Sequence, residues 1–265
     1  MRGHYHVFMD SFMQKWGLIL HALALTGVLI IVRLIIGFFG LDTFSVTNLV
    51  TAFVGGAIFT IAIILTGTLR DYKESEKIPG ELATSISALY ADCDLARKTY
   101  SVIAEEMKGH VRELLAAINT NFKRNSWDAL EITGVIATVN DGIYQLADNG
   151  VAPPFLVKMR MELVNIERLS NRIQVIKHTS FIPAAYAIAE LAAAGVILIL
   201  FFVRFDKFYE SLVLFTAITS LLISLLLLIR DIDDPFEVGI KSYADVDLTI
   251  LFKLEKELSD RQKNK

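Results

Sequence analysis

Four long apolar stretches restrict what this chain can fold into more than any other feature. They cover residues 17–40, 46–69, 182–203 and 210–229. A helix needs about 20 mainly apolar residues to cross a bilayer, and no soluble fold needs four helices that are apolar on every face. Hydrophobic residues make up 54% of the chain, against about 45–50% in a typical soluble domain. The sequence therefore predicts a membrane protein with four transmembrane helices.

The polar segments around these stretches set the expected topology. The loops within each pair of spans are short, so each pair returns the chain to the side from which it came. The remaining segments hold most of the Lys and Arg residues, which places these segments and both termini in the cytoplasm. We expect the protein to lie in the plasma membrane. No small-residue cleavage site follows the first apolar stretch, so we expect it to stay in the membrane. The expected division is a cytoplasmic N-terminal segment 1–16, spans one and two in 17–69, a cytoplasmic helical domain 70–179, spans three and four in 180–229, and a cytoplasmic C-terminal tail 230–265.

The long polar segment between the two pairs of spans has the periodicity of helices. Leu82, Ile86 and later apolar residues recur at three- and four-residue spacing, and no strand pattern competes. Gly109 and Gly150 are expected to end helices, and Ser126 is a candidate N-cap. The predicted fold class is all-α, with four transmembrane helices and a cytoplasmic helical domain.

Residue patterns typical of enzymes are missing from the sequence. It contains no nucleophile elbow, P-loop, HExxH or CxxC motif, so we expect no enzymatic activity. The net charge of −3 argues against nucleic acid as a partner. His4 and His6 could hold a metal only weakly at their spacing, and no cofactor is expected. The one cysteine, Cys93, lies between Asp92 and Asp94, a setting that raises a thiol pKa rather than activating it.

Two charged residues lie inside the apolar stretches. Arg33 is in the first and Glu190 is in the third. A charge at the bilayer centre costs about 2.5–3.5 kcal/mol on insertion scales. Glu190 could face a water-filled path or a neighbouring subunit. Alternatively, Arg33 and Glu190 form a structural ion pair, or Arg33 reaches outward from the end of its helix, near Gly40.

The second apolar stretch has one polar-to-apolar face. Gly55 and Gly56 in the same stretch would allow a neighbouring helix to approach closely. A face that begins with hydroxyls and becomes apolar suits a pore with a hydrophobic constriction, but a tightly packed bundle helix has the same pattern. The residues that share this face are Thr47, Thr51, Val54, Ile58, Ala62 and Leu65.

Two parts of the sequence resemble the bestrophin family and its bestrophin-like prokaryotic relatives. In the C-terminal third, an Arg-rich segment precedes Pro183 at the start of the third span, and an acidic-Pro-Phe motif follows the fourth. The motif reads Asp234-Pro235-Phe236-Glu237, with Gly239 one position late. The exit of the second span is similar to the bestrophin pattern of Arg, an aromatic residue, a polar stretch and Leu-Pro. The matching residues are Arg70, Tyr72, Glu76, Ile78 and Pro79.

The resemblance implies a homopentameric ion channel whose subunits associate with the lipid bilayer and with one another. Bestrophins conduct chiefly anions, although prokaryotic relatives can prefer cations, and their second spans line a funnel with an apolar neck. Matching on the span exit places that neck at Val54, Ile58 and Ala62. The family usually has phenylalanine there, whereas Phe53 and Phe59 lie elsewhere on this helix. Passive conduction of small inorganic ions, with chloride slightly preferred, is therefore expected.

Two rival functions stay open at this point. One is a non-conducting membrane scaffold or sensor whose cytoplasmic helices bind a partner. The other is a secondary transporter, although no inverted repeat with broken helices is evident. Flux through liposomes would separate a channel from a scaffold.

The acidic cluster after the fourth span has a further implied role. Calcium-gated bestrophins bind calcium there, and this chain retains Asp231 and Asp234 as ligand-like residues. The later acidic pair of that site is replaced by Gly239 and Ser242. Calcium takes six to eight oxygen ligands. The missing ones could come from Asp245 and Asp247 if the loop folds back; otherwise Pro235 ends the helix, and the carboxylates keep its exit in water or pair with Arg230.

Overall fold

The structure is a computed structural model in which the chain divides into two compact units. Unit 1 comprises Met1–Tyr72, Ser180–Asp234 and Lys241–Ala244, and unit 2 comprises Lys73–Thr179, Pro235–Ile240 and Asp245–Lys265. The residues described are 2–98, 100–178, 183–204, 207–238 and 243–263.

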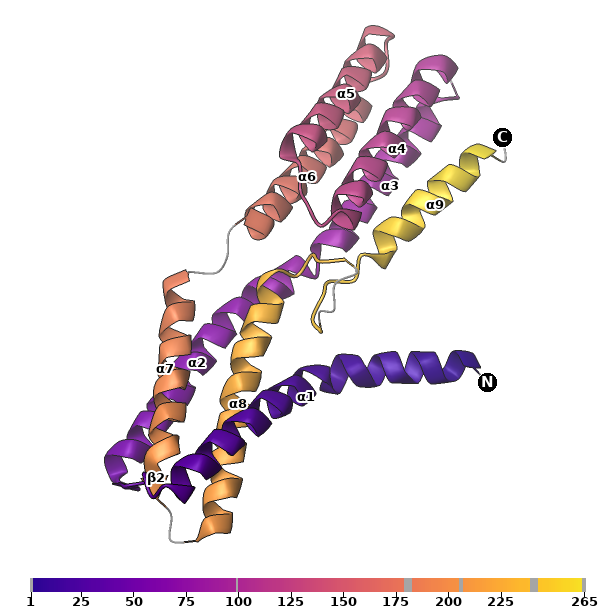
Figure 1. Cartoon of the computed structure of the whole chain (residues 1–265). Helices are drawn as coiled ribbons and strands as arrows, with labels where there is room; N and C mark the ends of the chain where they lie inside the picture. Colours follow the sequence, from indigo (N-terminus) through magenta and orange to yellow (C-terminus); the bar gives the residue numbers. More distant parts are fainter. Residues whose placement is uncertain (1, 99, 179–182, 205–206, 239–242, 264–265) are drawn as a thin grey trace. The chain divides into compact units, whose positions relative to one another are not determined.

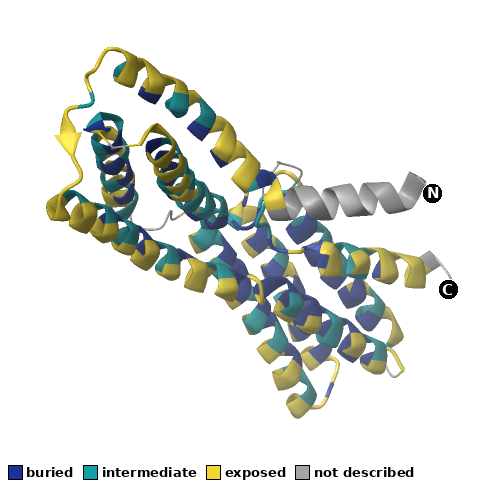
Figure 2. Ribbon diagram, turned by 90° about the horizontal axis from the view of Figure 1, so that it is seen from below, coloured by how far each residue is buried: buried dark blue, intermediate teal, exposed yellow. Residues whose placement is uncertain are grey.

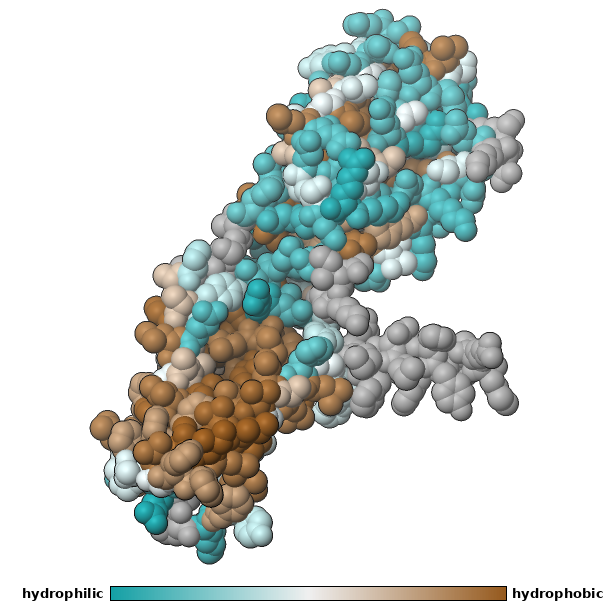
Figure 3. Space-filling model, viewed as in Figure 1, coloured by the Kyte–Doolittle hydropathy of each residue, from teal (hydrophilic) through white to brown (hydrophobic). Residues whose placement is uncertain are grey.

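Unit 1 is built from long apolar helices (Figure 1). Its helices are α1 (Arg2–Phe38), most of α2 (Asn48–Ser75), α7 (Pro183–Phe202) and α8 (Phe208–Asp233). Four helices in the described residues are long and apolar enough to cross a membrane, which confirms the four predicted spans. Hydrophobic residues cover most of the viewed face of unit 1, whereas hydrophilic residues cover most of the viewed face of unit 2 (Figure 3).

The core of unit 1 joins α2, α7 and α8 through one stripe from each helix. Small residues on α7 allow the neighbouring helices to approach closely. Many residues of these helices are exposed (Figure 2), and they include large hydrophobic side chains, as expected for helices that contact lipid or other copies. The buried core residues are Ala57, Ile61, Ile64, Ala189, Ala193, Val196, Leu200, Phe215, Leu222 and Ile229.

A short parallel strand pair closes one end of unit 1. Strand β1 (Phe44–Ser45) pairs with β2 (Val203–Arg204), which joins the α1–α2 connection to the α7–α8 connection. We call this end of unit 1, where both connections lie, the loop end. The sequence did not predict this ladder, because two-residue strands leave no periodic signal.

Unit 2 is a bundle of helices in which α3 lies beside α4 and α6, and α5 lies beside α4 and α6 (Figure 1). Its helices are α3 (Ile78–Ala96), α4 (Ser101–Lys123), α5 (Ala129–Asp148), α6 (Pro153–His178) and α9 (Thr249–Lys263). Apolar residues at helical spacing form its core, and they include Leu82, Ile86, Leu89, Val111, Leu114, Ile118, Val139, Leu163, Ile166 and Ile173.

Several helix ends in unit 2 differ from those expected. Gly109 lies inside α4 rather than ending a helix. The carboxylate of Asp128, not Ser126, caps α5 by accepting the N–H groups of Leu130 and Glu131 at 3.0 and 3.1 Å. Gly150 does follow the end of α5, and its φ of +85° shows why glycine suits the position.

The C-terminal segment of unit 2 is a folded element. Leu251 and Leu258 of α9 are buried. The side chain of Asn119 on α4 donates to the Leu251 carbonyl at 3.2 Å and to the Glu255 carboxylate at 2.8 Å. The expected cytoplasmic tail 230–265 therefore includes a helix that belongs to the core of unit 2.

A buried charged cluster lies between α3, α4 and α6 of unit 2. The ammonium group of Lys108 is 1% exposed and lies 2.5 Å from the Asp94 carboxylate. It also lies 4.6 Å from the centre of the Tyr90 ring. Asp92 is buried and forms an ion pair with Lys158 at 2.6 Å. Cys93 is fully buried next to this cluster, and burial raises the pKa of its thiol to about 12, with the Asp92 charge adding to the rise.

Candidate functional site

The predicted pore-lining face of α2 lies at the edge of its packed face. Val54 and Ile58 are half-buried and contact the core of unit 1, whereas Thr51 and Ala62 are exposed. Ala57 and Ile61, about one turn apart on α2, are buried within unit 1. The predicted neck residues therefore lie between the packed and open faces, partly accessible in a single chain.

The open face of α2 contains the two glycines. A Cβ atom added to Gly55 or Gly56 would meet nothing within 4 Å, so these glycines do not serve packing within one chain. Phe59 and Ile63 on α2 are 68% and 57% exposed. Phe53 instead packs on α7, where its ring lies 3.3 Å from the Cβ position of Gly195. The surface around Gly55 and Gly56 is thus open to lipid or to another copy of the chain.

The threonines of α2 present a weakly polar, uncharged surface. The hydroxyl of Thr51 donates to the Thr47 carbonyl at 3.3 Å, and that of Thr66 donates to the Ala62 carbonyl at 2.8 Å. The donor of each hydroxyl is therefore used within the helix, and its lone pairs remain as acceptors. From residue 48 to residue 69 the helix contains no charged side chain.

Arg33 is a structural residue at the loop end of unit 1, where its guanidinium group bonds to main-chain carbonyls rather than to Glu190, one of the partners considered from the sequence. Its Nη1 donates to the Phe201 carbonyl at 2.9 Å, and its Nη2 donates to the Val203 carbonyl at 2.6 Å. The Asp42 carboxylate lies 3.8 Å away. The side chain does not reach outward to solvent, because Arg33 is only 7% exposed. It satisfies carbonyls where α7 ends and β2 begins.

Glu190 lies in the first half of α7, far from the carbonyls that Arg33 contacts. Glu190 and Phe201 are eleven positions apart, which corresponds to about 16 Å along a helix. Glu190 is exposed and lines a 460 Å³ pocket of unit 1 between α7 and α8. Tyr186, Arg230 and Asp233 line the same pocket. The α8 acid and base therefore share a pocket with the carboxylate of α7.

Two of the carboxylates near the end of the fourth span accept main-chain N–H groups. The Asp231 carboxylate accepts the Tyr243 N–H at 3.0 Å within unit 1. Within unit 2 the loop does fold back, since the Val246 N–H donates to the Pro235 carbonyl at 2.8 Å. Asp247, however, accepts the Thr249 N–H at 2.8 Å where α9 begins.

Nowhere among the described residues do three His, Cys, Asp or Glu side chains gather as metal ligands would, whereas calcium takes six to eight oxygens. Gly239 and Ser242, and the side chains of His4 and His6, lie outside the described residues.

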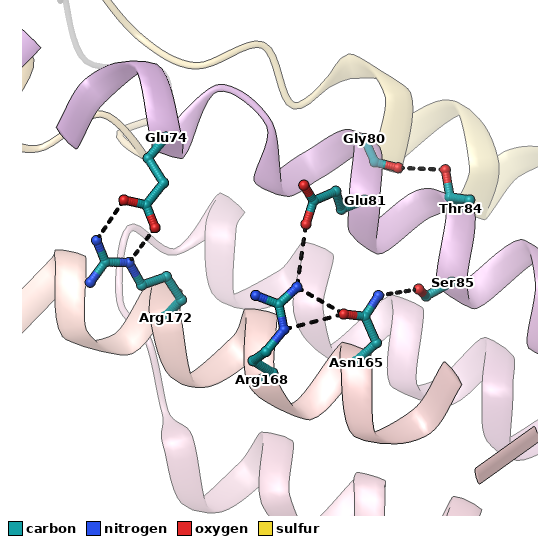
Figure 4. Close-up of polar contacts among 8 residues, drawn as sticks. All are labelled: Glu74, Gly80, Glu81, Thr84, Ser85, Asn165, Arg168 and Arg172. Atoms are coloured by element: carbon teal, nitrogen blue, oxygen red, sulfur yellow. Dashed lines mark hydrogen bonds and ion pairs between the residues drawn. The ribbon is translucent and has the colours of Figure 1, made fainter. Parts of the chain in front are cut away.

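The end of α2 that belongs to unit 2 is held by α6, a contact that sequence reasoning missed. Arg172 forms two hydrogen bonds with the Glu74 carboxylate, at 3.1 and 3.0 Å, and Arg168 lies 3.5 Å from Glu81 (Figure 4). Arg168 and Arg172 are four residues apart, so they lie on the same face of α6, and this spacing could have indicated a contact with acidic residues. Pro79, one of the bestrophin-like residues, lies in the first turn of α3. Proline is tolerated there because N–H groups in the first turn have no partner within the helix.

Comparison with known proteins finds similarity only in structure. No family model matches the sequence, and no curated protein matches it. A crystal structure of a bacterial bestrophin homologue from Klebsiella pneumoniae matches with a TM-score of 0.76 at 13% identity, over 92% of this chain and 98% of that chain. A second structure of such a homologue has a TM-score of 0.73 at 12% identity, over 92% and 97%. A structure described as a membrane protein has a TM-score of 0.76 at 13% identity, over 91% and 97%.

These matches span nearly the full length of both chains, so they concern the whole architecture rather than one helix pair. At 13% identity they establish the fold and leave the activity to be tested. The resemblance that the sequence showed at the exits of the second and fourth spans is confirmed at the level of fold. The chain has the bestrophin fold.

Proposed function

We propose that this chain is the subunit of a homopentameric ion channel in the plasma membrane, with both termini in the cytoplasm. Small inorganic ions pass down their gradient through a central pore lined by α2 from each copy. The fold shared with the bacterial bestrophin homologue over 92% of the chain supports this proposal. A preference for chloride rests on the family resemblance alone.

The observation that carries the proposal is the uncovered face of α2. An apolar span that leaves two glycines without a neighbour within 4 Å is poorly packed as a monomer. A second copy seated against Gly55 and Gly56 would bury this face and turn the flank with Val54 and Ile58 toward a shared axis. Several copies are needed for such a pore, since these two residues are only half-buried within their own subunit.

The chemistry of the neck follows from its residues. Val54, Ile58 and Ala62 offer no charge and no hydrogen bond, so an ion passing them must lose water. Selectivity would then depend on neck width and on how readily the ion dehydrates, rather than on a ring of fixed charge. Glu190 is an auxiliary candidate for contact with ions if its pocket is filled with water.

The test is ion flux through liposomes that contain the purified protein. The matched variants are Ile58→Ala and Ile63→Ala. Both remove the same atoms from the same helix, but Ile58 lies on the proposed pore side of α2 and Ile63 lies on another side. We expect chloride or potassium flux above that of empty vesicles, increased by Ile58→Ala because the neck widens and little changed by Ile63→Ala. Flux equal to that of empty vesicles, with intact oligomers, would contradict the channel. Equal effects of both variants would contradict the assigned pore face.

The alternative is a non-conducting membrane scaffold or sensor that binds a partner through unit 2. It is favoured by an apolar groove of 580 Å³ between α5 and α6, lined by exposed side chains that include Tyr144, Val157 and Met161. Intact oligomers without flux would support this alternative.

A further inference from the structure

A pocket at the loop end of unit 1 combines two guanidinium groups with apolar walls. It has a volume of 430 Å³ and lies between the end of α1, β2 and the start of α8. Its charged lining residues among those described are Arg33, Arg204 and Asp42, so two positive groups face one negative group. The pocket therefore has an excess of positive charge inside a unit whose surface is otherwise mainly apolar.

Arg33 has donors that the protein does not use. Its Nη1 bonds to the Phe201 carbonyl, and its Nη2 bonds to the Val203 carbonyl and to Ser211 Oγ at 3.3 Å. This accounts for three of the five N–H donors of a guanidinium. The Nε atom is buried and has no hydrogen-bond partner. Asp42 lies 3.8 Å away, beyond hydrogen-bond length, so it offsets the charge without occupying these donors.

Arg204 provides the second positive group, and it is exposed. Its main chain is fixed by the pairing of Ser45 with Arg204 in the β1–β2 ladder. The first turn of α8 begins beside the pocket, and its N-cap residue, Lys207, makes no side-chain cap. The N–H groups of this turn and the positive end of the helix dipole add to the attraction for an anion.

The remaining walls are apolar and exposed. Leu34, Phe38 and Phe208 line the pocket, and their side chains are 42%, 86% and 60% exposed. A free anion needs only the arginines, whereas these walls suit a chain attached to the anion.

We propose that this pocket binds a phosphate-type oxyanion, held by the guanidinium groups of Arg33 and Arg204. The phosphate belongs either to an anionic phospholipid whose acyl chains lie along Leu34 and Phe208 or to free inorganic phosphate. The bound ligand would contact the end of α1, strand β2 and the start of α8 at the same time, and so stabilise their packing. This site is independent of ion conduction, so the proposal stands whether or not the protein is a channel.

The test is native mass spectrometry of the purified full-length protein with three probes. These are phosphatidylglycerol, phosphatidylcholine and inorganic phosphate, with thermal unfolding in detergent as a second readout. The key variant is Arg204→Gln. The matched control is Lys207→Gln, which removes an adjacent exposed charge that pairs with Glu210 at 2.9 Å and does not line the pocket.

We expect phosphatidylglycerol to bind and to raise the unfolding temperature, with affinity about tenfold lower for Arg204→Gln and unchanged for Lys207→Gln. If inorganic phosphate alone reproduces the stabilisation and the variant effect, the site is confirmed and its ligand is the free anion. Equal binding of phosphatidylglycerol and phosphatidylcholine would overturn the proposal. So would equal losses in the two variants, which would indicate diffuse surface charge. Thermal unfolding without added ligand shows whether each variant is folded.

Discussion

The Nη2 atom of Arg33 donates to the main-chain carbonyl of Val203 at 2.6 Å, although the two residues lie 170 positions apart in the sequence. This bond and the one to Phe201 bind the last turns of α1 to the junction of α7 and β2. A charge that looks anomalous in a transmembrane helix thus donates to main-chain carbonyls where α7 ends and β2 begins.

Replacing Arg33 by Met should lower the free energy of unfolding by about 2–4 kcal/mol, because buried carbonyls lose their donors while the side-chain length is kept. Arg33→Lys should recover only part of this loss, since an ammonium cannot place two planar donors. Lys207→Met, on the exposed surface nearby, is the control and should change little. Denaturant unfolding in detergent measures all three. Equal stability of Arg33→Met and the natural protein would show that these bonds are not needed.

The sequence predicted the four spans well and the partners of their charged residues poorly. Hydrophobic length is a local property, so the expected spans and the helices α1, α2, α7 and α8 overlap closely. Arg33 is different, because its partners are main-chain carbonyls that every residue has and that only the fold brings within reach. The same reason explains why Glu190 could be considered as one of its possible partners. The sequence shows that the two residues have opposite charges. It does not show how far apart they lie along the axes of the packed helices.

Cys93 should be unreactive in the folded protein. Burial and the neighbouring Asp92 raise the pKa of its thiol to about 12, from an ordinary value near 9.0. The thiolate is the reactive form, and a rise of this size lowers its fraction about a thousandfold. We expect no labelling by iodoacetamide at pH 8 in detergent and full labelling after denaturation, followed by mass spectrometry. Because the raised pKa favours the folded state only while the thiol is protonated, this contribution to stability should fall as the pH rises from about 9 toward 12.

Asp247 should stabilise the start of α9 in a pH-dependent way. The Thr249 side chain and N–H donate to its carboxylate and lower its pKa. A lowered pKa means that the contribution is present above the unfolded value, near 4, and is lost as the pH falls through the folded value. Asp247→Ala should lower the free energy of unfolding by about 1 kcal/mol at pH 7, and by less at pH 3. Asp247→Asn, which keeps an acceptor but removes the charge, should lose part of this stability at pH 7 and differ less from the natural protein at pH 3. A loss that is the same at both pH values would contradict the role of the charge.

The ion pair between Arg172 and Glu74 should contribute little to stability despite its two hydrogen bonds. Both side chains are more than one third exposed, so water screens the charges. We expect Glu74→Gln and Arg172→Gln each to cost less than about 1 kcal/mol, with a coupling of about 0.5 kcal/mol in a double-mutant cycle. Circular dichroism during denaturation measures the four proteins of the cycle. A coupling of several kcal/mol would mean that the pair is shielded from water in the assembled protein.

The candidate pore face was only partly predictable. Three- and four-residue spacing identifies which residues of α2 share a face, but it does not say how that face is rotated relative to the other helices. The structure adds that Ala57 and Ile61 face the core, which leaves Val54 and Ile58 on the flank and Gly55 on the open side. In the proposed channel, other copies of the chain decide what the open side contacts. The spacing of residues along one helix does not show where those copies lie.

Cysteine substitution along α2 can determine the rotation of this helix directly, because Cys93, the one native cysteine, is buried and should be silent. In liposomes, Ile58→Cys and Ala62→Cys should react with a charged, membrane-impermeant methanethiosulfonate reagent, and the added bulk at the neck should reduce ion flux. Ile63→Cys has the same parent residue but lies on the other side of the helix, 57% exposed in a single chain. Facing lipid or a neighbouring copy, it should not react with a reagent confined to water. The unsubstituted protein treated in the same way controls for Cys93. Rapid modification of Ile63→Cys with block of flux, and none at Ile58→Cys, would place the pore on the glycine-bearing side of α2 and overturn the assignment of Val54, Ile58 and Ala62.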